Sequence, residues 1–447
     1  MIRPDFVLRG RRVATPEGVR PAAVRVAGGR IVSVGPYEGP HSGIPVEDLA
    51  DALLLPGLVD THVHVNEPGR THWEGFETAT AAAAAGGITT VIDMPLNSIP
   101  PTTTRAGWLA KIDAAAGRCS VDVGFWGGLV PGNRAELTGL RAVGAFGFKC
   151  FLAPSGVREF PEVDDEGLRS AANELARTGA PLLVHAEAAS LLEEPAGPAA
   201  SYAAYLRSRP PAAEIAAIDS VIRLSRDTGV AVHVLHLSAA DALPSLAAAR
   251  AEGLPLTVET CPHYLTFAAE EIADGATLFK CAPPIRAREN RERLWRGLAD
   301  GVIDMVVSDH SPCPPEDKRL DEGDFVSAWG GIASLELTLA AVWTGAAERG
   351  IAPARVVEWM SAAPARLAGL VHDKGAIMSG RQADFVVFDP EAEQIVDGSA
   401  LHQRHPQTPY AGRALRGRVQ ATWLRGEKIF DGGRLVRAGR GELLLSG

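Results

Sequence analysis

The amino-acid sequence predicts an α/β protein: a (β/α)8 barrel of the TIM type, with a small β-sandwich subdomain built from both chain ends. Two observations lead to this prediction. Eight apolar runs end in polar residues, and most are followed by stretches with helical spacing. Short β-branched runs broken by glycines occupy both ends of the chain. Strands that alternate with helices pair in parallel, and eight such units close a barrel.

The first part of the chain, residues 1–55, contains short β-branched runs separated by Gly-Gly and Gly-Pro turns. Residues 376–447 show a similar pattern, in which apolar runs alternate with glycines. We therefore expect these two parts to form one β subdomain beside a barrel of residues 56–375. The expected strands of the subdomain are 5–8, 22–26, 30–34, 384–388, 419–424 and 428–430.

The barrel strands are expected where apolar runs end in polar residues. Most of these runs precede stretches rich in Ala, Leu, Glu and Arg, for example 166–177 and 214–226, which have the spacing of helices. The eight expected strands are 58–64, 89–93, 121–124, 145–150, 181–185, 231–236, 255–260 and 303–309.

The composition is that of a globular protein and excludes several partners. Of the 447 residues, 46% are hydrophobic and 22% are charged. Asp and Glu outnumber Lys and Arg by 54 to 44, and the net charge of -10 repels nucleic acid. The longest apolar stretches fall well short of the roughly 20 residues that span a bilayer. We expect neither a nucleic-acid partner nor a membrane partner.

The cellular location is predicted from the first residues and from the cysteines. Residues 1–13 mix charged and apolar positions, so they lack the continuous core of a signal peptide. The five cysteines are an odd and sparse set without a Cys-x-x-Cys pair, which indicates free thiols in a reducing compartment. The expected location is the cytoplasm.

Polar residues at the carboxyl ends of the barrel strands are the candidates for chemistry, because active sites of such barrels lie there. The first strand ends in Asp60-Thr61-His62-Val63-His64, and side chains alternate along a strand, so His62 and His64 share a face. Taken alone, a His-x-His pair can also occur by chance at a surface. Three later strands supply further metal-binding groups, and the convergence of all of them on one rim predicts a metal site: His185, His236 and Asp309.

Lys149 ends the fourth strand, on the same expected rim. Its ammonium form has no lone pair and cannot bind a cation. Desolvation favours the neutral amine, which can add carbon dioxide, and the resulting carbamate has two oxygens able to bridge two metals. The alternative is that Lys149 forms an ion pair with Asp309 or with a nearby glutamate.

Five sequence motifs together resemble one family of enzymes. They are DTHVHVNEPGR at 60–70, DMPLNS at 93–98, GFKCF at 147–151, SDHSPC at 308–313 and WGGI at 329–332. The chain resembles the cyclic amidohydrolases of the dihydroorotase, hydantoinase and allantoinase group, and among these it most resembles the allantoinases. The resemblance covers nearly the whole chain.

The resemblance implies a centre of two divalent metal ions, for which zinc is the usual metal, although these ligand types also accept cobalt, manganese or iron. One metal would be held by His62, His64 and Asp309 and a second by His185 and His236, with a carbamate on Lys149 as the bridge between them. His233 lies close to His236 in the sequence but on the opposite strand parity, so we expect it to be structural.

Asp309 is the expected catalytic residue. Two cations can share a water, lower its pKa towards neutrality and polarise a carbonyl oxygen. Asp309 would take the proton as hydroxide attacks the ring amide, and would then pass it to the departing nitrogen. Amide nitrogen is a poor leaving group unless it is protonated.

Three polar residues are expected to contact the substrate: Asn66, Asn97 and Ser311. Dihydroorotases typically place Arg where this chain has Asn66, and there a guanidinium suits a substrate carboxylate. An amide suits a neutral ureide better because it offers both a donor and an acceptor. Asn97 and Ser311 match polar positions of the allantoinase pocket, although Asn97 could simply satisfy a turn.

The resemblance implies that the protein opens the hydantoin ring of allantoin to allantoate, in purine breakdown. The alternatives are a hydantoinase or dihydropyrimidinase, a dihydroorotase or, from another class, a non-catalytic scaffold homologue. The expected partner is a small neutral cyclic ureide, and a homo-oligomer, either tetramer or dimer, is implied by the relatives. Arg70 could act as a substitute clamp for an anion, but we expect it to pair with Glu67 or Glu74.

Overall fold

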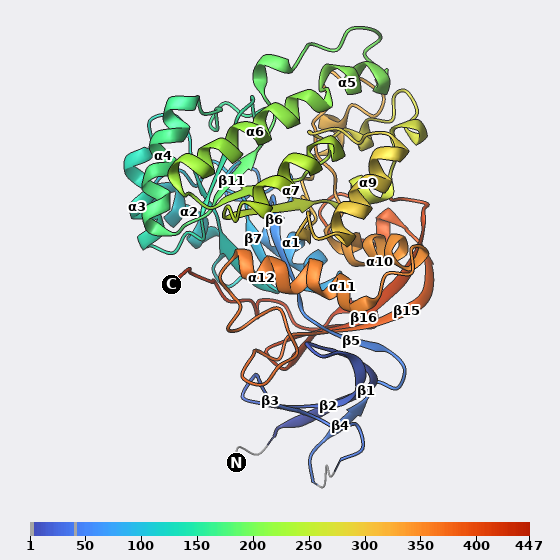
Figure 1. Cartoon of the computed structure of the whole chain (residues 1–447). Helices are drawn as coiled ribbons and strands as arrows, with labels where there is room; N and C mark the ends of the chain where they lie inside the picture. Colours follow the sequence, from blue (N-terminus) through green and yellow to red (C-terminus); the bar gives the residue numbers. More distant parts are fainter. Residues whose placement is uncertain (1–3, 40–42) are drawn as a thin grey trace.

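The computed structural model describes residues 4–39 and 43–447 and has two parts, a barrel and a β-sheet domain (Figure 1). Every one of the eight expected barrel strands is present. They are β6 (Leu58–Val63), β7 (Ile88–Asp93), β8 (Asp122–Phe125), β10 (Phe148–Phe151), β11 (Leu182–His185), β12 (Val232–Val234), β13 (Leu256–Thr260) and β14 (Met305–Val306).

The barrel strands pair in parallel and close into a ring. β6 pairs with β7 and β7 with β8, and a second set runs from β10 through β14. The first and last strands meet where the backbone N–H of His64 donates to the carbonyl of His310 at 2.8 Å. The remaining gap is bridged by β9 (Gly127–Gly128), which pairs with β10, and by a 3.2 Å bond from Phe146 N to Phe125 O. The predicted barrel is confirmed.

Helices cover the outside of the barrel, and α4 illustrates why they form where they do. Its N-terminus is capped by Asp164, whose side chain accepts from the N–H of Gly167 at 2.8 Å. It ends at Gly179, which takes the left-handed conformation (φ 67°) typical of helix ends. The face that packs against the barrel has helical spacing: Leu168, Ala171, Ala172 and Leu175.

The α-helices, in chain order, are α1 (Phe76–Ala85), α2 (Arg105–Ala115), α3 (Leu137–Ala142), α4 (Asp165–Thr178), α5 (Tyr202–Ser208), α6 (Pro211–Thr228), α7 (Leu243–Ala251), α8 (Pro262–Thr266), α9 (Arg288–Ala299), α10 (Thr338–Glu348), α11 (Pro353–Val357) and α12 (Ala363–Leu367). A π-helical turn, Glu358–Ala362, joins the last two. Within the two described ranges, none of the helices has both the length and the apolar character needed to cross a membrane.

Strands from both chain ends form one nine-stranded sheet, as the sequence predicts. Its order is β18-β17-β16-β15-β5-β1-β2-β3, with β4 paired to β1. The sheet surrounds an apolar core of its own, to which the N-terminal strands contribute Leu8, Val24 and Ile31 and the C-terminal strands contribute Phe385 and Trp423. The strands are β1 (Phe6–Thr15), β2 (Gly18–Ala27), β3 (Arg30–Gly35), β4 (Val46–Asp48), β5 (Leu53–Pro56), β15 (Phe385–Ile395), β16 (Ala414–Leu424), β17 (Glu427–Asp431) and β18 (Arg434–Leu435).

A buried cluster of charged residues connects the sheet to the barrel. Lys374 Nζ lies 2.6 Å from a carboxylate oxygen of Asp122 and 2.6 Å from one of Asp384. Asp122 also accepts from the guanidinium of Arg425, which follows β16. Because Asp122 is the first residue of β8, the cluster lies at the amino ends of the barrel strands. This cluster therefore does not cover the carboxyl ends of the barrel strands, where the predicted site residues lie.

Candidate functional site

A cavity of about 1000 Å³ opens at the carboxyl ends of the barrel strands. Five of the six residues predicted to bind metal line it, and they come from five different strands or from the residues that follow them: His64, Lys149, His185, His236 and Asp309. The sixth, His62, lies beneath the lining and is fully buried. The structure therefore brings the predicted rim residues together.

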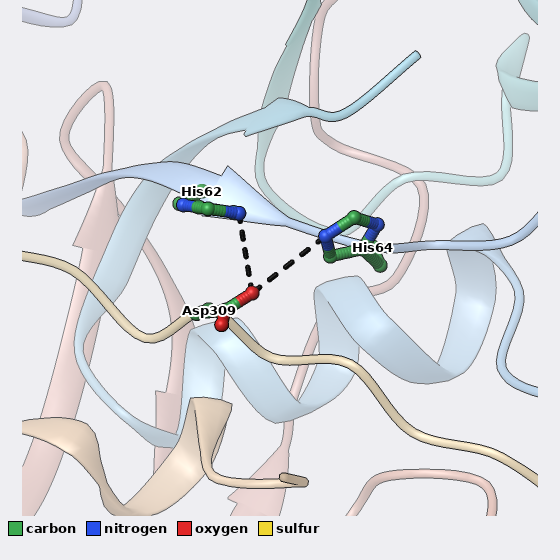
Figure 2. A group of neighbouring side chains, drawn as sticks. All are labelled: His62, His64 and Asp309. Atoms are coloured by element: carbon green, nitrogen blue, oxygen red, sulfur yellow. Dashed lines mark ion pairs between the residues drawn. The ribbon is translucent and has the colours of Figure 1, made fainter. Parts of the chain in front are cut away.

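The first group of side chains is formed by His62, His64 and Asp309. Nε2 of His62 lies 3.1 Å, and Nε2 of His64 lies 3.6 Å, from the same carboxylate oxygen of Asp309. Figure 2 shows the rings of His62 and His64 on either side of this oxygen. Since the ligand atoms lie within 4.8 Å of one another, one cation could bind all three residues.

The second group lies directly beside the first. Nδ1 of His185 is 3.0 Å from Nε2 of His236, and the ring centroids of His62 and His236 are 5.4 Å apart. Lys149 Nζ lies between the groups, 3.3 Å from Nε2 of His62 and 5.0 Å from the centroid of the Phe151 ring. Lys149 forms no ion pair within 4.0 Å among the described residues, but the charges of Asp309 and Glu259 act to raise its pKa, so the expected alternative of an ion pair stays a prediction.

Burial sets the protonation of the site. It lowers the pKa of His62, His64 and His236 well below the usual value, so these imidazoles are neutral and each has a free lone pair. It lowers the pKa of Lys149 to about 8 and raises that of Asp309 to about 8. Cation binding would offset these desolvation effects on Asp309, because an adjacent positive charge favours the ionised carboxylate.

An unpartnered nitrogen indicates that the donor set fits a cation. Nδ1 of His236 is buried and has no hydrogen-bond partner among the described residues, while Nε2 faces His185. A buried nitrogen without a partner destabilises a protein by about 1–3 kcal/mol. Neutral imidazoles and a carboxylate are the groups that zinc and related divalent cations bind. The residues present therefore suit divalent metal ions.

Several site residues have backbones in the left-handed region. The angle φ is 35° at His236, 45° at Asp309, 66° at Asn66 and 68° at Asn97. Such conformations are uncommon outside glycine and destabilise on the order of 1–3 kcal/mol each. They turn the chain sharply at the strand ends, so that the side chains of His236 and Asp309 point to the centre of the rim instead of continuing the strand alternation.

Glu259 is a site residue that the sequence reasoning missed. One carboxylate oxygen accepts from Nδ1 of His62 and from the backbone N–H of His236 (3.1 Å), and the other lies 2.9 Å from Nε2 of His233. His233 also contacts the hydroxyl of Thr257 at 2.8 Å, so it supports Glu259, in agreement with the expected structural role. The sequence did contain a signal for Glu259. It is the second-last residue of a barrel strand and so lies near the carboxyl end, where the predicted ligands also lie.

Glu187 plays the same part for the second group. Its carboxylate lies 2.8 Å from Nε2 of His185 and forms an ion pair with Arg209. Burial acts to raise the pKa of Glu187, but the charge of Arg209 and the hydrogen bonds outweigh it and lower the pKa to about 2. Since Glu187 holds Nε2 of His185, the free nitrogen of that ring is Nδ1, which faces His236.

The three predicted substrate contacts have different surroundings. Asn97 and Ser311 line the cavity, and the Asn97 amide lies 3.3 Å from Nδ1 of His64, so it also orients that ring. Asn66 is buried outside the cavity lining, and its amide donates to the carbonyl of Pro312 at 3.3 Å. A contact between Asn66 and substrate stays a prediction.

The expected partners of Arg70 are wrong. Arg70 forms an ion pair with Glu159, in the loop after β10, and donates to the carbonyl of Asn97 at 2.7 Å. Glu67 pairs instead with Arg118, and Glu74 accepts from His310 at 3.2 Å. The prediction failed because nearby acids in the sequence face other elements, whereas Glu159 is brought close by the fold.

Fold and site together define a barrel enzyme whose rim could hold divalent cations, and comparisons specify it further. Residues 53–429 match the model of the amidohydrolase family. The chain is 54% identical to an allantoinase of Streptomyces avermitilis, over 98% of each chain. It is 44% identical to an allantoinase of Arabidopsis thaliana, over 99% of this chain and 91% of that protein.

Solved structures give the same result. An L-hydantoinase (dihydropyrimidinase) from Arthrobacter aurescens matches with a TM-score of 0.95 at 31% identity, covering 99% of this chain and all of the other (100%). A dihydropyrimidinase from Brevibacillus agri matches with a TM-score of 0.89 at 29% identity, covering 99% and 98% of the two chains. The chain belongs to the amidohydrolase family and is a cyclic amide hydrolase.

Proposed function

We propose that this protein hydrolyses the hydantoin ring of allantoin and releases allantoate. The observation that carries the proposal is the likeness to allantoinases over nearly the full length of both chains. The geometry supports it, because the residues that the family resemblance assigns to catalysis converge on one cavity. Hydantoinases share the fold, so the substrate is the point that an experiment must test.

The proposed metal centre uses two groups of ligands. His62, His64 and Asp309 would hold one divalent ion, and His185 and His236 a second, with zinc as the proposed metal. Divalent ions at this position would polarise the carbonyl of the substrate and lower the pKa of a bound water. Support comes from the neutral, buried imidazoles and from the short distances between their nitrogens and the Asp309 carboxylate.

Lys149 is proposed to carry a carbamate. Its neutral amine adds carbon dioxide, forming an N–C bond and releasing one proton, and the product has two oxygens where the ammonium had none. Burial favours this step because it lowers the pKa of Lys149 to about 8, so a substantial share of the amine is neutral near that pH. The position between His62 and the Phe151 ring keeps bulk water away from the group.

Asp309 is proposed to move the proton during hydrolysis. Its carboxylate lines the cavity and faces the rings of His62 and His64, so it lies beside the point where a water would attack the ring amide. One carboxylate oxygen would accept the proton of this water and then donate it to the ring nitrogen as the C–N bond breaks. Without this transfer the nitrogen would have to leave as an anion.

The rest of the cavity suits a neutral ring. Asn97 and Ser311 present an amide and a hydroxyl that can bond to carbonyl and N–H groups of a ureide. Arg70, the guanidinium next to Asn97, is already paired with Glu159 and is therefore a poor clamp for a substrate carboxylate. This pairing argues against dihydroorotate as the substrate.

A turnover panel tests the proposal. Purified protein of known metal content is assayed side by side on allantoin, hydantoin, dihydrouracil and dihydroorotate. We expect the highest kcat/KM with allantoin; a higher value with any other ring would overturn the substrate assignment. Protein that holds no divalent metal and turns over none of the four would instead be the scaffold homologue. Mass measurement of the native protein and of a Lys149→Ala variant tests the carbamate.

The cysteines support a proposal about the cellular location. All five cysteines are free, buried thiols, which suits a reducing compartment such as the cytoplasm. A homo-oligomer, tetramer or dimer, is proposed because the family commonly forms one. Light scattering after size-exclusion chromatography gives the mass in solution, and a monomer would contradict this part.

A further inference from the structure

A second cluster of metal-binding side chains lies behind the proposed centre. Cys261 follows β13 and His263 lies in α8, and both side chains approach Asp309. The Sγ atom of Cys261, a ring nitrogen of His263 and a carboxylate oxygen of Asp309 lie within 4.8 Å of one another. Neither Cys261 nor His263 belongs to the ligand set proposed above, and neither lines the cavity.

His263 provides independent evidence that this cluster binds a ligand. Its side chain is completely buried, and neither Nδ1 nor Nε2 has a hydrogen-bond partner among the described residues. Burial lowers the pKa of His263 to about 3, so the ring is neutral and one of its nitrogens has a free lone pair. Buried polar side chains nearly always have a partner. The side chains of Cys261 and Asp309 lie close enough for a cation shared with them to supply the partner that this ring lacks.

We propose that Cys261, His263 and Asp309 form an additional site for a soft divalent cation such as Zn²⁺, Cd²⁺ or Co²⁺. A thiolate and an imidazole select these ions over Mg²⁺ and Ca²⁺, which prefer oxygen ligands. Binding forms one metal–sulfur bond and releases the Cys261 proton to solvent. Three protein ligands leave the fourth position of a tetrahedral ion open.

The site has a consequence for catalysis that rests on the proposed function. Asp309 belongs to both clusters, and in the proposed reaction its carboxylate moves the proton. A cation held by Cys261 and His263 would bind that carboxylate and keep it from accepting a proton. Excess soft metal is therefore expected to inhibit an enzyme that already contains its catalytic ions, and the inhibition depends on Cys261.

Cys281 provides a matched control. This thiol is also buried, and it lines the cavity close enough to Asp309 for the carboxylate charge to raise its pKa, after the larger effect of burial. It is not part of the cluster with His263. Replacing Cys281 therefore removes a buried thiol that lines the cavity and leaves the proposed site intact.

The binding experiment uses Co²⁺ and the metal-loaded enzyme. The proposed catalytic ligands contain no sulfur, so a thiolate-to-cobalt charge-transfer absorption in the near ultraviolet reports the new site alone. We expect this absorption to saturate at one Co²⁺ per chain, to vanish in Cys261→Ser and to persist in Cys281→Ser. The inference is overturned if the wild type shows no such band at saturating Co²⁺, or if Cys281→Ser loses the band and Cys261→Ser keeps it.

The inhibition experiment uses excess Zn²⁺. Cys261→Ser and His263→Gln should each raise the concentration for half inhibition by at least about tenfold, because each removes one ligand. Equal inhibition of wild type and both variants would overturn the inhibitory role. Failure of the two proposals can be told apart: a cobalt–thiolate band without allantoin turnover refutes the proposed function alone, whereas turnover without the band refutes this site alone. Circular dichroism checks that each variant is folded.

Discussion

The contacts of Glu259 lead to a prediction about how the two groups of ligands are held together. Its first oxygen accepts from Nδ1 of His62 and from the backbone N–H of His236. The bond to Nδ1 leaves Nε2 of His62 without a proton and directed at Asp309. The bond to the backbone holds His236 in its left-handed conformation. Changing Glu259 should therefore weaken metal binding in both groups.

The size of the effect depends on the substitution. Glu259→Gln keeps one carbonyl oxygen, which can still accept from His62 and His236, and its NH2 group can donate to His233 if that ring changes tautomer. Glu259→Ala removes every one of these bonds and leaves buried donors without acceptors. Loss of such partners lowers metal affinity by about 10–100-fold, equivalent to about 1.4 to 2.8 kcal/mol. We expect Gln near the lower limit and Ala at or beyond the upper one.

Chelator competition measures the affinity, and kcat/KM on allantoin is measured at saturating metal. His233→Asn is the matched control, because His233 contacts only the second oxygen of Glu259, and it should change metal affinity by less than about tenfold. If Glu259→Ala binds metal as tightly as the wild type, Glu259 does not position the ligands. An effect of His233→Asn as large as that of Glu259→Ala would place the important contact at the other oxygen.

Further predictions concern catalysis and stability. Asp309→Asn should lower kcat on allantoin by at least about 100-fold, as expected for loss of general acid–base catalysis, and unchanged kcat would contradict its role. Lys374→Met should lower the free energy of unfolding by about 3–5 kcal/mol in urea titrations, because it removes the ion-pair partner of the buried Asp384 and leaves Asp122 with Arg425 alone. Arg11→Met is its control, since Arg11 forms a solvent-exposed ion pair with Asp51, and its loss should leave that free energy nearly unchanged. The hydrogen bond to Glu336 raises the pKa of His402 above the ordinary value of 6.5, so the stabilisation from this contact is complete below pH 6.5 and is lost as pH rises through the raised pKa. The difference in unfolding free energy between wild type and His402→Gln should therefore shrink from pH 6 to pH 9, and a constant difference would refute the reasoning.

The barrel strands could be predicted from the sequence because buried parallel strands are apolar runs, and each such run corresponds to a strand of the structure. The first strand of the subdomain was harder to delimit. The expected segment 5–8 is the beginning of β1, which continues to Thr15 through Arg9, Arg11 and Arg12. Arg9 forms an ion pair with Asp48 and Arg11 with Asp51, and a bulge between Gly10 and Val13 breaks the alternation. A strand interrupted by arginines and a bulge gives a weak periodic signal in the sequence.

The metal-binding rim could be predicted because strand ends of a barrel meet at one edge, whatever their separation in sequence. The partners of these residues could not, because they depend on distances between side chains of different elements. Arg70 has two acids within a few residues, yet it pairs with Glu159, which is 89 positions away. Similarly, Glu259 reaches His62 across 197 positions. The order of the strands predicts which residues lie on the rim. Which carboxylate pairs with which histidine or arginine depends on how the side chains pack.

The structure has the features of a site that is assembled before its cations bind. Neutral imidazoles, a carboxylate of raised pKa and left-handed backbones at His236 and Asp309 all destabilise the fold, each by a few kcal/mol at most. They persist because carboxylates behind the rim, Glu259 and Glu187, hold the rings from their far sides. A cation that binds these groups would relieve the desolvation of Asp309 and would bind the nitrogens of His185 and His236 that face each other. The same buried groups that destabilise the fold therefore give the rim affinity for metal, since metal binding and folding are energetically coupled.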